Sequence, residues 1–230
     1  MDLLEGLATT RAIRRYSDAP VTDEELATIL WSATRAPSGS NRQPFRFIVL
    51  RDGPRAVAAR GVLGAAAARM WKGKQATDGY ASGSGAEPGS PKARMARTMQ
   101  HYVDTYESAP VLVLACYVRY RGHKAISDGA SVYPACQNLL LAARALGYGG
   151  VMTGWHFAAE PELRALLHIP DEVELVATIT LGRPQGRHGP VRRRPLPELV
   201  FGEQWGQPPD WAVDPTGTRH TAAGPPAPTA

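Results

Sequence analysis

The sequence predicts a mixed fold of helices and strands, in which the helices outnumber the strands. Short β-rich runs at 44–50, 109–118 and 173–184 alternate along the chain with longer segments that have helical apolar spacing. The run at 109–118, APVLVLACYV, is continuously apolar, which is typical of a strand that is buried on both faces. A chain of 230 residues is long enough to form one large domain around such strands.

The first predicted helix begins at a clear start signal. Thr22 and Glu25 have the spacing of a capping box, and apolar residues follow at helical intervals until one or two residues before Pro37. A strand is predicted over 44–50. A helix over 54–71 follows and begins with proline, which favours the first turn of a helix.

A long loop or lid is predicted over 72–91, where aliphatic residues are few and Gly, Ser and Pro are frequent. A helix over 92–107 and the apolar strand follow it. The next helix is apolar nearly all round over 132–146, with Ser127 or Asp128 as its N-cap. We therefore expect it to be the central buried helix.

The last third of the chain contains a strand end and loop at 149–157, a short helix at 160–169 and the last strand. From about residue 184 the sequence loses its regular period but keeps apolar side chains. Such a C-terminal extension is expected to lie against the body of the protein or a partner subunit. We predict one domain over 1–211 and a disordered tail over 212–230.

The charge of the chain is spread without a dominant basic face. A formal net charge of +5 comes from 22 Arg and 4 Lys, which are scattered among 21 acidic residues. A protein that binds nucleic acid gathers its cations on one surface, so we expect no nucleic-acid partner. No window approaches the ~18 apolar residues of a membrane span, the first residues lack a secretory signal, and Cys116 and Cys136 form no CxxC pair. We therefore expect a cytoplasmic protein that does not bind membranes.

Several classes of catalytic site lack their motifs here. The sequence has no GxxxxGK[ST] phosphate loop, no GxSxG nucleophile elbow and no HExxH zinc motif, and its six His are isolated from one another. The glycines at 83–89 lack the spacing of a dinucleotide fingerprint, and no strand precedes them. We therefore expect no metal site and no serine nucleophile.

Two arginine clusters lie near opposite ends of the chain. Arg11, Arg14 and Arg15 precede the first capped helix, and three consecutive arginines occupy 192–194. A guanidinium group matches the oxygens of a phosphate and keeps its charge when it is buried. Each cluster alone is also consistent with a solvated arginine patch. Together they favour one phosphate-bearing ligand that is held from several segments.

Two further segments have the composition of ligand-contacting turns. Residues 37–41, PSGSN, offer hydroxyl, amide and backbone donors with little bulk, between a predicted helix end and a strand. The glycines of 147–157 would allow the backbone to pass close to a ligand. Either segment is also consistent with a plain connection between two elements.

These motifs together resemble the FMN-dependent nitroreductase superfamily. TTRAIRRYSDAPVTDEELATIL is similar to the family's opening R-S-x-R-x-[FY], with Ala12 in place of the usual serine. APSGSNRQPFRFIVL is similar to its P-S-x-x-N-x-Q-P-W segment, with Phe45 in place of tryptophan. The long central helix with its glycine-rich strand, and the closing G-x-P and R-[KR]-P-L motifs, follow in the family's order over about residues 9–205.

The resemblance implies an α+β fold in which a mostly antiparallel sheet is flanked by helices, and an intertwined homodimer with two FMN sites at its interface. The residues at the family's cofactor-binding positions are Arg11, Ala12, Arg14, Arg15, Pro37, Ser38, Gly39, Ser40, Asn41, Gln43, Thr153, Gly154 and Arg193. The arginines would hold the phosphate and the ribityl chain, and at Ala12 only the backbone could act. The turn at 37–43 would line the flavin from the partner subunit. Thr153 and Gly154 would place a backbone N–H near flavin N5.

The implied activity is hydride transfer from NADH or NADPH, through flavin N5, to a nitroaromatic, a quinone or a similar small acceptor. The flavin carries this chemistry, so no catalytic side chain is predicted. Trp71, Tyr80 and Trp155 are candidates for the substrate pocket and, with equal weight, for simple packing. Two alternatives stay open: a pathway-specific flavin dehydrogenase, ene-reductase or dehalogenase-like member of the same fold, and a flavin-binding protein without turnover.

Overall fold

The computed structural model describes residues 1–120 and 126–215, which fall into two compact parts. The larger part, Ala12–Arg187, contains the sheet and most of the helices. The smaller part joins the two ends of the described chain, Met1–Arg11 and the residues from His188 onward. Most of the tail predicted over 212–230 lies outside the described residues.

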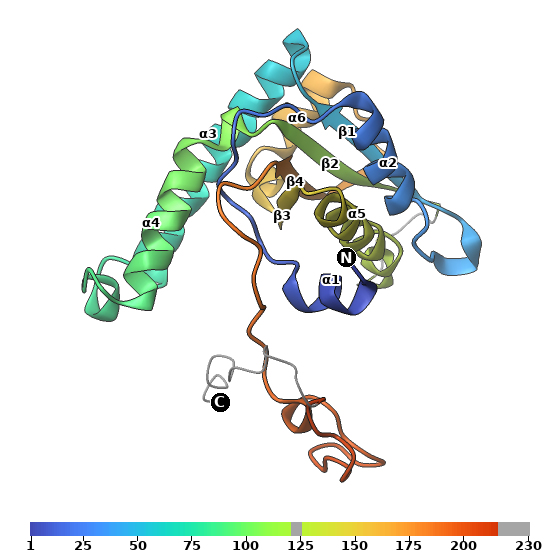
Figure 1. Cartoon of the computed structure of the whole chain (residues 1–230). Helices are drawn as coiled ribbons and strands as arrows, with labels where there is room; N and C mark the ends of the chain where they lie inside the picture. Colours follow the sequence, from blue (N-terminus) through green and yellow to red (C-terminus); the bar gives the residue numbers. More distant parts are fainter. Residues whose placement is uncertain (121–125, 216–230) are drawn as a thin grey trace. The chain divides into compact units, whose positions relative to one another are not determined.

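A four-stranded antiparallel sheet forms the centre of the larger part (Figure 1). Its strands are β1 (Phe45–Leu50), β2 (Val111–Val118), β3 (Gly149–Thr153) and β4 (Val173–Gly182), in the spatial order β1-β2-β4-β3. All three strand pairings are antiparallel. The continuously apolar run predicted as a buried strand is β2, whose side chains from Val111 to Tyr117 are all buried.

Helices cover both faces of this sheet (Figure 1). They are α2 (Asp23–Ala33), α3 (Pro54–Thr77), α4 (Pro91–Asp104), α5 (Tyr133–Ala145) and α6 (Glu160–Leu167). Side chains of a strand alternate between its faces, so Val111 and Val113 pack with α2 and α5, whereas Leu112 and Leu114 pack with α3, α4 and α6. The predicted α+β fold, with helices flanking an antiparallel sheet, is confirmed.

A β-bulge divides β4 into two halves. Ala177 pairs with Ala115, but the next pair along β2 joins Cys116 to Leu175, so Val176 is an extra residue. The extra residue reverses the alternation, because Ala177 packs with α2 and α5 while Leu175 packs on the opposite face. The bulge therefore allows one strand to supply odd-numbered side chains to both apolar layers.

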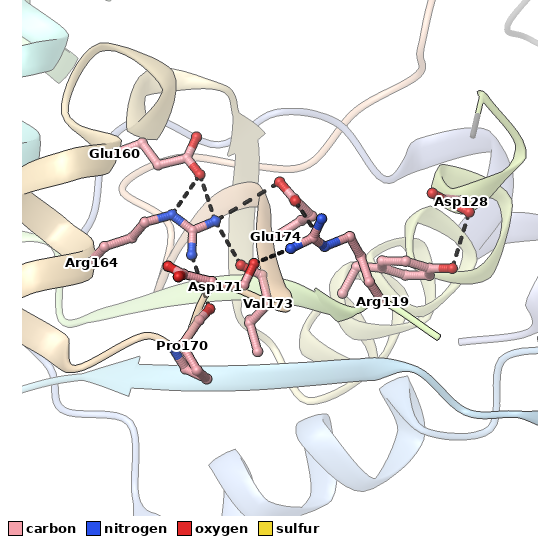
Figure 2. Close-up of polar contacts among 9 residues, drawn as sticks. Arg119, Asp128, Glu160, Arg164, Pro170, Asp171, Val173 and Glu174 are labelled. Atoms are coloured by element: carbon pink, nitrogen blue, oxygen red, sulfur yellow. Dashed lines mark hydrogen bonds and ion pairs between the residues drawn. The ribbon is translucent and has the colours of Figure 1, made fainter. Parts of the chain in front are cut away.

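An ion-pair network fastens α6 to the ends of β2 and β4 (Figure 2). The guanidinium of Arg164 donates to a Glu160 carboxylate oxygen at 2.7 Å and to the Val173 carbonyl at 2.6 Å. Glu174 lies 3.8 Å from the same guanidinium and 3.2 Å from that of Arg119. The network alternates in sign, so each of the inner charges has an opposite charge on either side.

A buried arginine connects α3 to the start of β2. Arg60 is 8% exposed, and its guanidinium donates to the carbonyls of Glu107 at 2.8 Å, of Arg51 at 3.1 Å and of Ala109. Burial lowers the pKa of Arg60, although the group keeps its charge at neutral pH. One side chain therefore satisfies three backbone carbonyls that have no strand partner.

The element boundaries differ from the sequence-based expectation at two helices. The capping box at Thr22 and Glu25 is confirmed. The helix α3 continues to Thr77 rather than ending at 71, because Trp71 and Gln75 both donate to Gln100 of α4. The prediction that Ser127 or Asp128 caps the central helix is wrong. A 3-10 turn over Ile126–Ser131 precedes that helix, and Asp128 accepts a hydrogen bond from Tyr117 instead.

The smaller part begins with a short helix that the sequence analysis did not predict. This helix, α1 (Leu3–Thr9), is capped by Asp2, whose carboxylate accepts from the backbone of Leu4 at 2.7 Å. The returning C-terminal segment pairs with its end, since the Val191 N–H donates to the Ala8 carbonyl at 3.1 Å. Within the described ranges, every helix is too short or too polar to span a lipid bilayer.

Candidate functional site

The polar turn predicted at 37–43 connects α2 to β1 in a strained backbone conformation. Ser40, Asn41 and Gln43 have φ angles of 51°, 50° and 51°, in the left-handed region that L residues rarely adopt. Two side-chain oxygens hold the turn: the Ser38 hydroxyl accepts from the Gln43 N–H at 2.9 Å, and the Ser131 hydroxyl accepts from the Gly39 N–H at 3.1 Å. The turn is therefore fixed on the segment just before α5.

A pocket of about 410 Å³ opens beside this turn. It is lined mainly by 37–40, Arg42, Tyr120, Ser127 and Ser131. Four of the turn residues predicted from the sequence thus share one pocket, whereas Asn41 and Gln43 do not line it. Sequence reasoning missed Arg42, Tyr120 and Ser131, because the last two come from distant segments that only the fold brings to the turn.

The end of β3 contains the predicted pair Thr153 and Gly154. The Thr153 hydroxyl lies 2.7 Å from the hydroxyl of Thr178 on β4, and that hydroxyl donates to the Thr153 carbonyl at 3.1 Å. A Cβ at Gly154 would lie 2.8 Å from the ring of Phe157. Phe157 is an exposed side chain, so a larger residue at 154 would displace its ring, and glycine leaves room for it.

The segment 12–17 runs beside the sheet edge that β3 forms. The Ile13 N–H donates to the Gly150 carbonyl at 3.0 Å, and the Arg15 carbonyl accepts from Gln185 at 3.0 Å. Between these contacts Arg14 is half-buried, whereas Arg15 is exposed. The positive charge of Arg14 acts on the hydroxyl of Tyr16, where it lowers the pKa that burial raises. Arg14 thus belongs to the same edge of the fold as β3.

A buried hydroxyl cluster underlies this edge and was not predicted. The Tyr16 hydroxyl donates to the Ile13 carbonyl at 2.6 Å, and the Thr180 hydroxyl lies 2.8 Å from Tyr16 and 2.7 Å from Tyr102. Burial raises the pKa of all three neighbouring tyrosines, with that of Tyr106 at about 12. The sequence feature that could have indicated it is the pair of alternate threonines in the mostly apolar second half of the strand VELVATITLG.

The smaller part contains the other two predicted arginines, Arg11 and Arg193, and both are exposed. A guanidinium nitrogen of Arg11 lies 4.0 Å from the position that a Cβ at Gly189 would take. Arg193 follows two residues after Val191, the partner of Ala8, and donates to the Arg192 carbonyl at 2.7 Å. One arginine of the first cluster, Arg11, and the whole of the second cluster therefore belong to the same compact part, whereas Arg14 and Arg15 belong to the larger part.

The three aromatic residues proposed for the substrate pocket contribute to packing in this arrangement. Trp71 is 3% exposed and lies against Tyr80, with 5.1 Å between ring centroids. Trp155 is 8% exposed and packs between Tyr102 and Tyr106, at 5.1 and 4.9 Å. Their role toward a substrate stays a prediction.

Acid is expected to destabilise the fold through His156, which follows Trp155. Its side chain is fully buried, and neither ring nitrogen has a hydrogen-bond partner among the described residues. Burial lowers the pKa of His156 from 6.5, while the charge of Glu160 raises it less. The unfolded chain therefore binds a proton that the folded protein excludes. The free energy of unfolding should be retained above about pH 6.5 and fall as the pH drops below it.

Urea unfolding of the wild type and of His156→Phe, at pH values on both sides of 6.5, would measure this effect. Phenylalanine keeps a ring without a titrating group, so the acid-induced loss should be smaller in this variant. A His168→Asn variant is the control, because His168 is exposed and asparagine tolerates its left-handed backbone. An equal acid-induced loss in wild type and His156→Phe would contradict the assignment.

The comparisons with known proteins agree with this fold. The sequence matches the Nitroreductase family over residues 7–183. A provisionally named NADH dehydrogenase/NAD(P)H nitroreductase of Archaeoglobus fulgidus is 30% identical over 210 residues, which cover 89% of this chain and 99% of the relative. A 5,6-dimethylbenzimidazole synthase of Rhodospirillum rubrum is 30% identical over 196 residues, or 82% of each chain.

A solved structure with the same fold contains a cofactor. It is a provisionally named nitroreductase of Desulfovibrio desulfuricans in complex with FMN, with a TM-score of 0.64, 29% identity, and coverage of 89% of this chain and 98% of that one. The resemblance inferred from the motifs is therefore confirmed. This chain belongs to the nitroreductase family.

Proposed function

We propose that this chain is an FMN-dependent oxidoreductase that transfers hydride from NAD(P)H to a nitroaromatic, a quinone or a similar small acceptor. The observation that carries the proposal is the placement of Arg11 and Arg193, from opposite ends of the sequence, in one compact part where Val191 pairs with Ala8. Exposed guanidinium groups suit a phosphate dianion, because they present several N–H donors and a permanent charge. The relatives named above support the same cofactor and electron donor.

The hydrogen-bond donors of the predicted site residues suit the chemical groups of a flavin nucleotide. Arg11, Arg14 and Arg193, with Arg15 as a further candidate, would neutralise the phosphate and bind the ribityl chain, and Ala12 would contribute its backbone alone. Bound FMN would supply hydride transfer through its N5 atom. The backbone of Thr153 and Gly154 would donate near that atom, and the hydroxyl bonds between Thr153 and Thr178 hold this strand end in place.

The proposal includes an intertwined homodimer with two equivalent sites. The strained turn would line the flavin of the partner subunit through Pro37, Ser38, Gly39, Ser40, Asn41 and Gln43. Its fixed conformation and the pocket beside it support this role, because a small-residue turn lets backbone donors approach a planar ring. In a dimer, each site would then be incomplete without the second chain.

Anaerobic titration of the purified protein tests the function. The FMN-loaded protein should be yellow, and NADH or NADPH should bleach its flavin absorbance within the time of mixing. Flavin that stays oxidised with both donors would favour a flavin-binding protein without turnover. Protein that cannot be reconstituted with FMN would contradict both readings.

The acceptor is a separate question, because a relative of equal identity has a different activity name, 5,6-dimethylbenzimidazole synthase. An open space over a flavin discriminates weakly among flat acceptors, so nitroaromatics, quinones and enones should all be assayed. Turnover with nitroaromatics and quinones would support the proposal. Turnover confined to one other acceptor class would favour the pathway-specific alternative within the same fold.

A further inference from the structure

One peptide group at the end of β3 has an open donor. The strand ends where Thr153 pairs with Thr178, close to the bulge in β4, and a 3-10 turn begins at Trp155. Gly154 lies between the strand and the turn, outside the ladder. Among the described residues its N–H has no hydrogen-bond partner, whereas its carbonyl accepts from Phe157 at 3.1 Å. The peptide between Thr153 and Gly154 therefore has a donor that no other described residue uses.

The acceptor end of the same peptide is held by a buried side chain. The Thr178 hydroxyl donates to the Thr153 carbonyl at 3.1 Å, and it lies 2.7 Å from the Thr153 hydroxyl. A carbonyl can only accept and a hydroxyl has one hydrogen, so the Thr153 hydroxyl is the donor in the shorter contact. Thr178 is fully buried, whereas Thr153 and Gly154 are partly exposed. Thr178 therefore holds the end of β3 from the interior of the protein.

A hydrogen bond at the carbonyl of a peptide also acts on the N–H of that peptide. The group is planar and trans, so the C=O of Thr153 and the N–H of Gly154 point in opposite directions and turn together. A bond accepted by the C=O polarises the whole group, which makes its N–H a stronger donor. Thr178 therefore orients and strengthens a donor that it does not contact.

We propose that Thr178 is a positioning residue for FMN, which holds and polarises the Gly154 N–H as a donor to flavin N5. The inference rests on the proposed function for the cofactor and for the place of Gly154 beside N5. The N5 atom has a free lone pair in oxidised FMN and carries a hydrogen in reduced FMN. A fixed N–H donor beside N5 therefore stabilises only the oxidised form, and it lowers the reduction potential of the bound flavin.

Thr178→Val removes the hydroxyl and keeps the β-branched shape. We expect about tenfold weaker binding of oxidised FMN, as for the loss of one hydrogen bond, with the binding of reduced FMN unchanged. The reduction potential should then rise by about 30 mV for a two-electron couple. Equilibrium dialysis in air and under anaerobic dithionite would measure the two affinities, and a dye-coupled redox titration would measure the potential. Thr178→Ser retains the hydroxyl and should keep the wild-type potential.

Thr180→Val is the matched control on the same strand. Thr180 is also fully buried, and its hydroxyl lies 2.8 Å from that of Tyr16 and 2.7 Å from that of Tyr102. Its replacement should change the affinity for both forms of FMN alike, so the potential should equal that of the wild type. Thr178→Ala is a second test variant, which removes the same hydroxyl if valine prevents folding.

Nuclear magnetic resonance tests the hydrogen bond without cofactor or turnover. The amide nitrogen resonance of Gly154 reports a bond at the carbonyl of its own peptide, so it should move upfield in Thr178→Val but not in Thr178→Ser or Thr180→Val. A wild-type potential in Thr178→Val, or an equal rise in Thr178→Ser or Thr180→Val, would overturn the inference. Protein that does not bind FMN would instead contradict the proposed function, while the Gly154 resonance still decides whether Thr178 holds the peptide.

Discussion

Replacing Arg11 or Arg193 by alanine is expected to weaken FMN retention by about 2–3 kcal/mol each, which is roughly a 30- to 150-fold rise in Kd. Each guanidinium would lose a charge-assisted hydrogen bond to the phosphate, and such bonds are about twice as strong as neutral ones. Equilibrium dialysis against FMN, followed by flavin fluorescence, would measure the change in Kd.

Two controls separate phosphate binding from a general surface effect. Riboflavin lacks the phosphate, so its affinity should change little in Arg11→Ala and Arg193→Ala. Arg55→Ala removes an exposed arginine of α3 that has no hydrogen bond or ion pair among the described residues, and it should retain FMN as the wild type does. Wild-type FMN affinity in both Arg11→Ala and Arg193→Ala would contradict phosphate binding. These arginines would then be interpreted as a solvated surface patch.

The largest loss of stability is expected at Arg60. Alanine there would leave three backbone carbonyls without their donor, the buried one of Ala109 and the partly buried ones of Glu107 and Arg51. An unsatisfied buried acceptor costs about 1–3 kcal/mol, so we expect a loss of roughly 3–5 kcal/mol in the free energy of unfolding, after partial relaxation. The corresponding fall in Tm is about 10 °C for a chain of this size. Urea and thermal unfolding followed by circular dichroism would measure both quantities.

Arg60→Lys provides the matched comparison for this prediction. Lysine keeps the charge but lacks the planar fork of donors, so it should satisfy fewer carbonyls and lose an intermediate amount of stability. The exposed Arg55 on the same helix should tolerate alanine with little change. A loss below about 1 kcal/mol in Arg60→Ala would mean that water replaces the guanidinium at all three carbonyls.

The sheet and most of the helices could be predicted because their signals are local. The apolar run of β2 and the capping box at Thr22 each lie within a few residues, and both appear in the structure. The end of α3 could not be predicted in this way. Its last turns depend on Gln100, a residue 25 positions away from Gln75, and the sequence between them shows only a loop-like composition.

In the candidate site too, local motifs could be predicted and contacts between distant residues could not. The arginine clusters and the turn at 37–41 are short motifs, so they were found from the sequence. The contact between Gly39 and Ser131, and the stacking of Arg42 on Tyr120, join segments that are far apart in the chain. Such pairs leave no periodic signal. The bulge at Val176 is hidden for another reason, because one extra residue in an apolar strand does not change its composition.

The left-handed backbone at Ser40, Asn41 and Gln43 has a consequence for how the turn would engage a ligand. An unfavourable backbone conformation costs about 1–3 kcal/mol at each such residue, and the hydrogen bonds to Ser38 and Ser131 hold it in place. The free energy of folding offsets this conformational cost before any ligand binds. A molecule arriving at the turn would therefore meet donors that are already ordered, and association would not have to freeze a mobile loop.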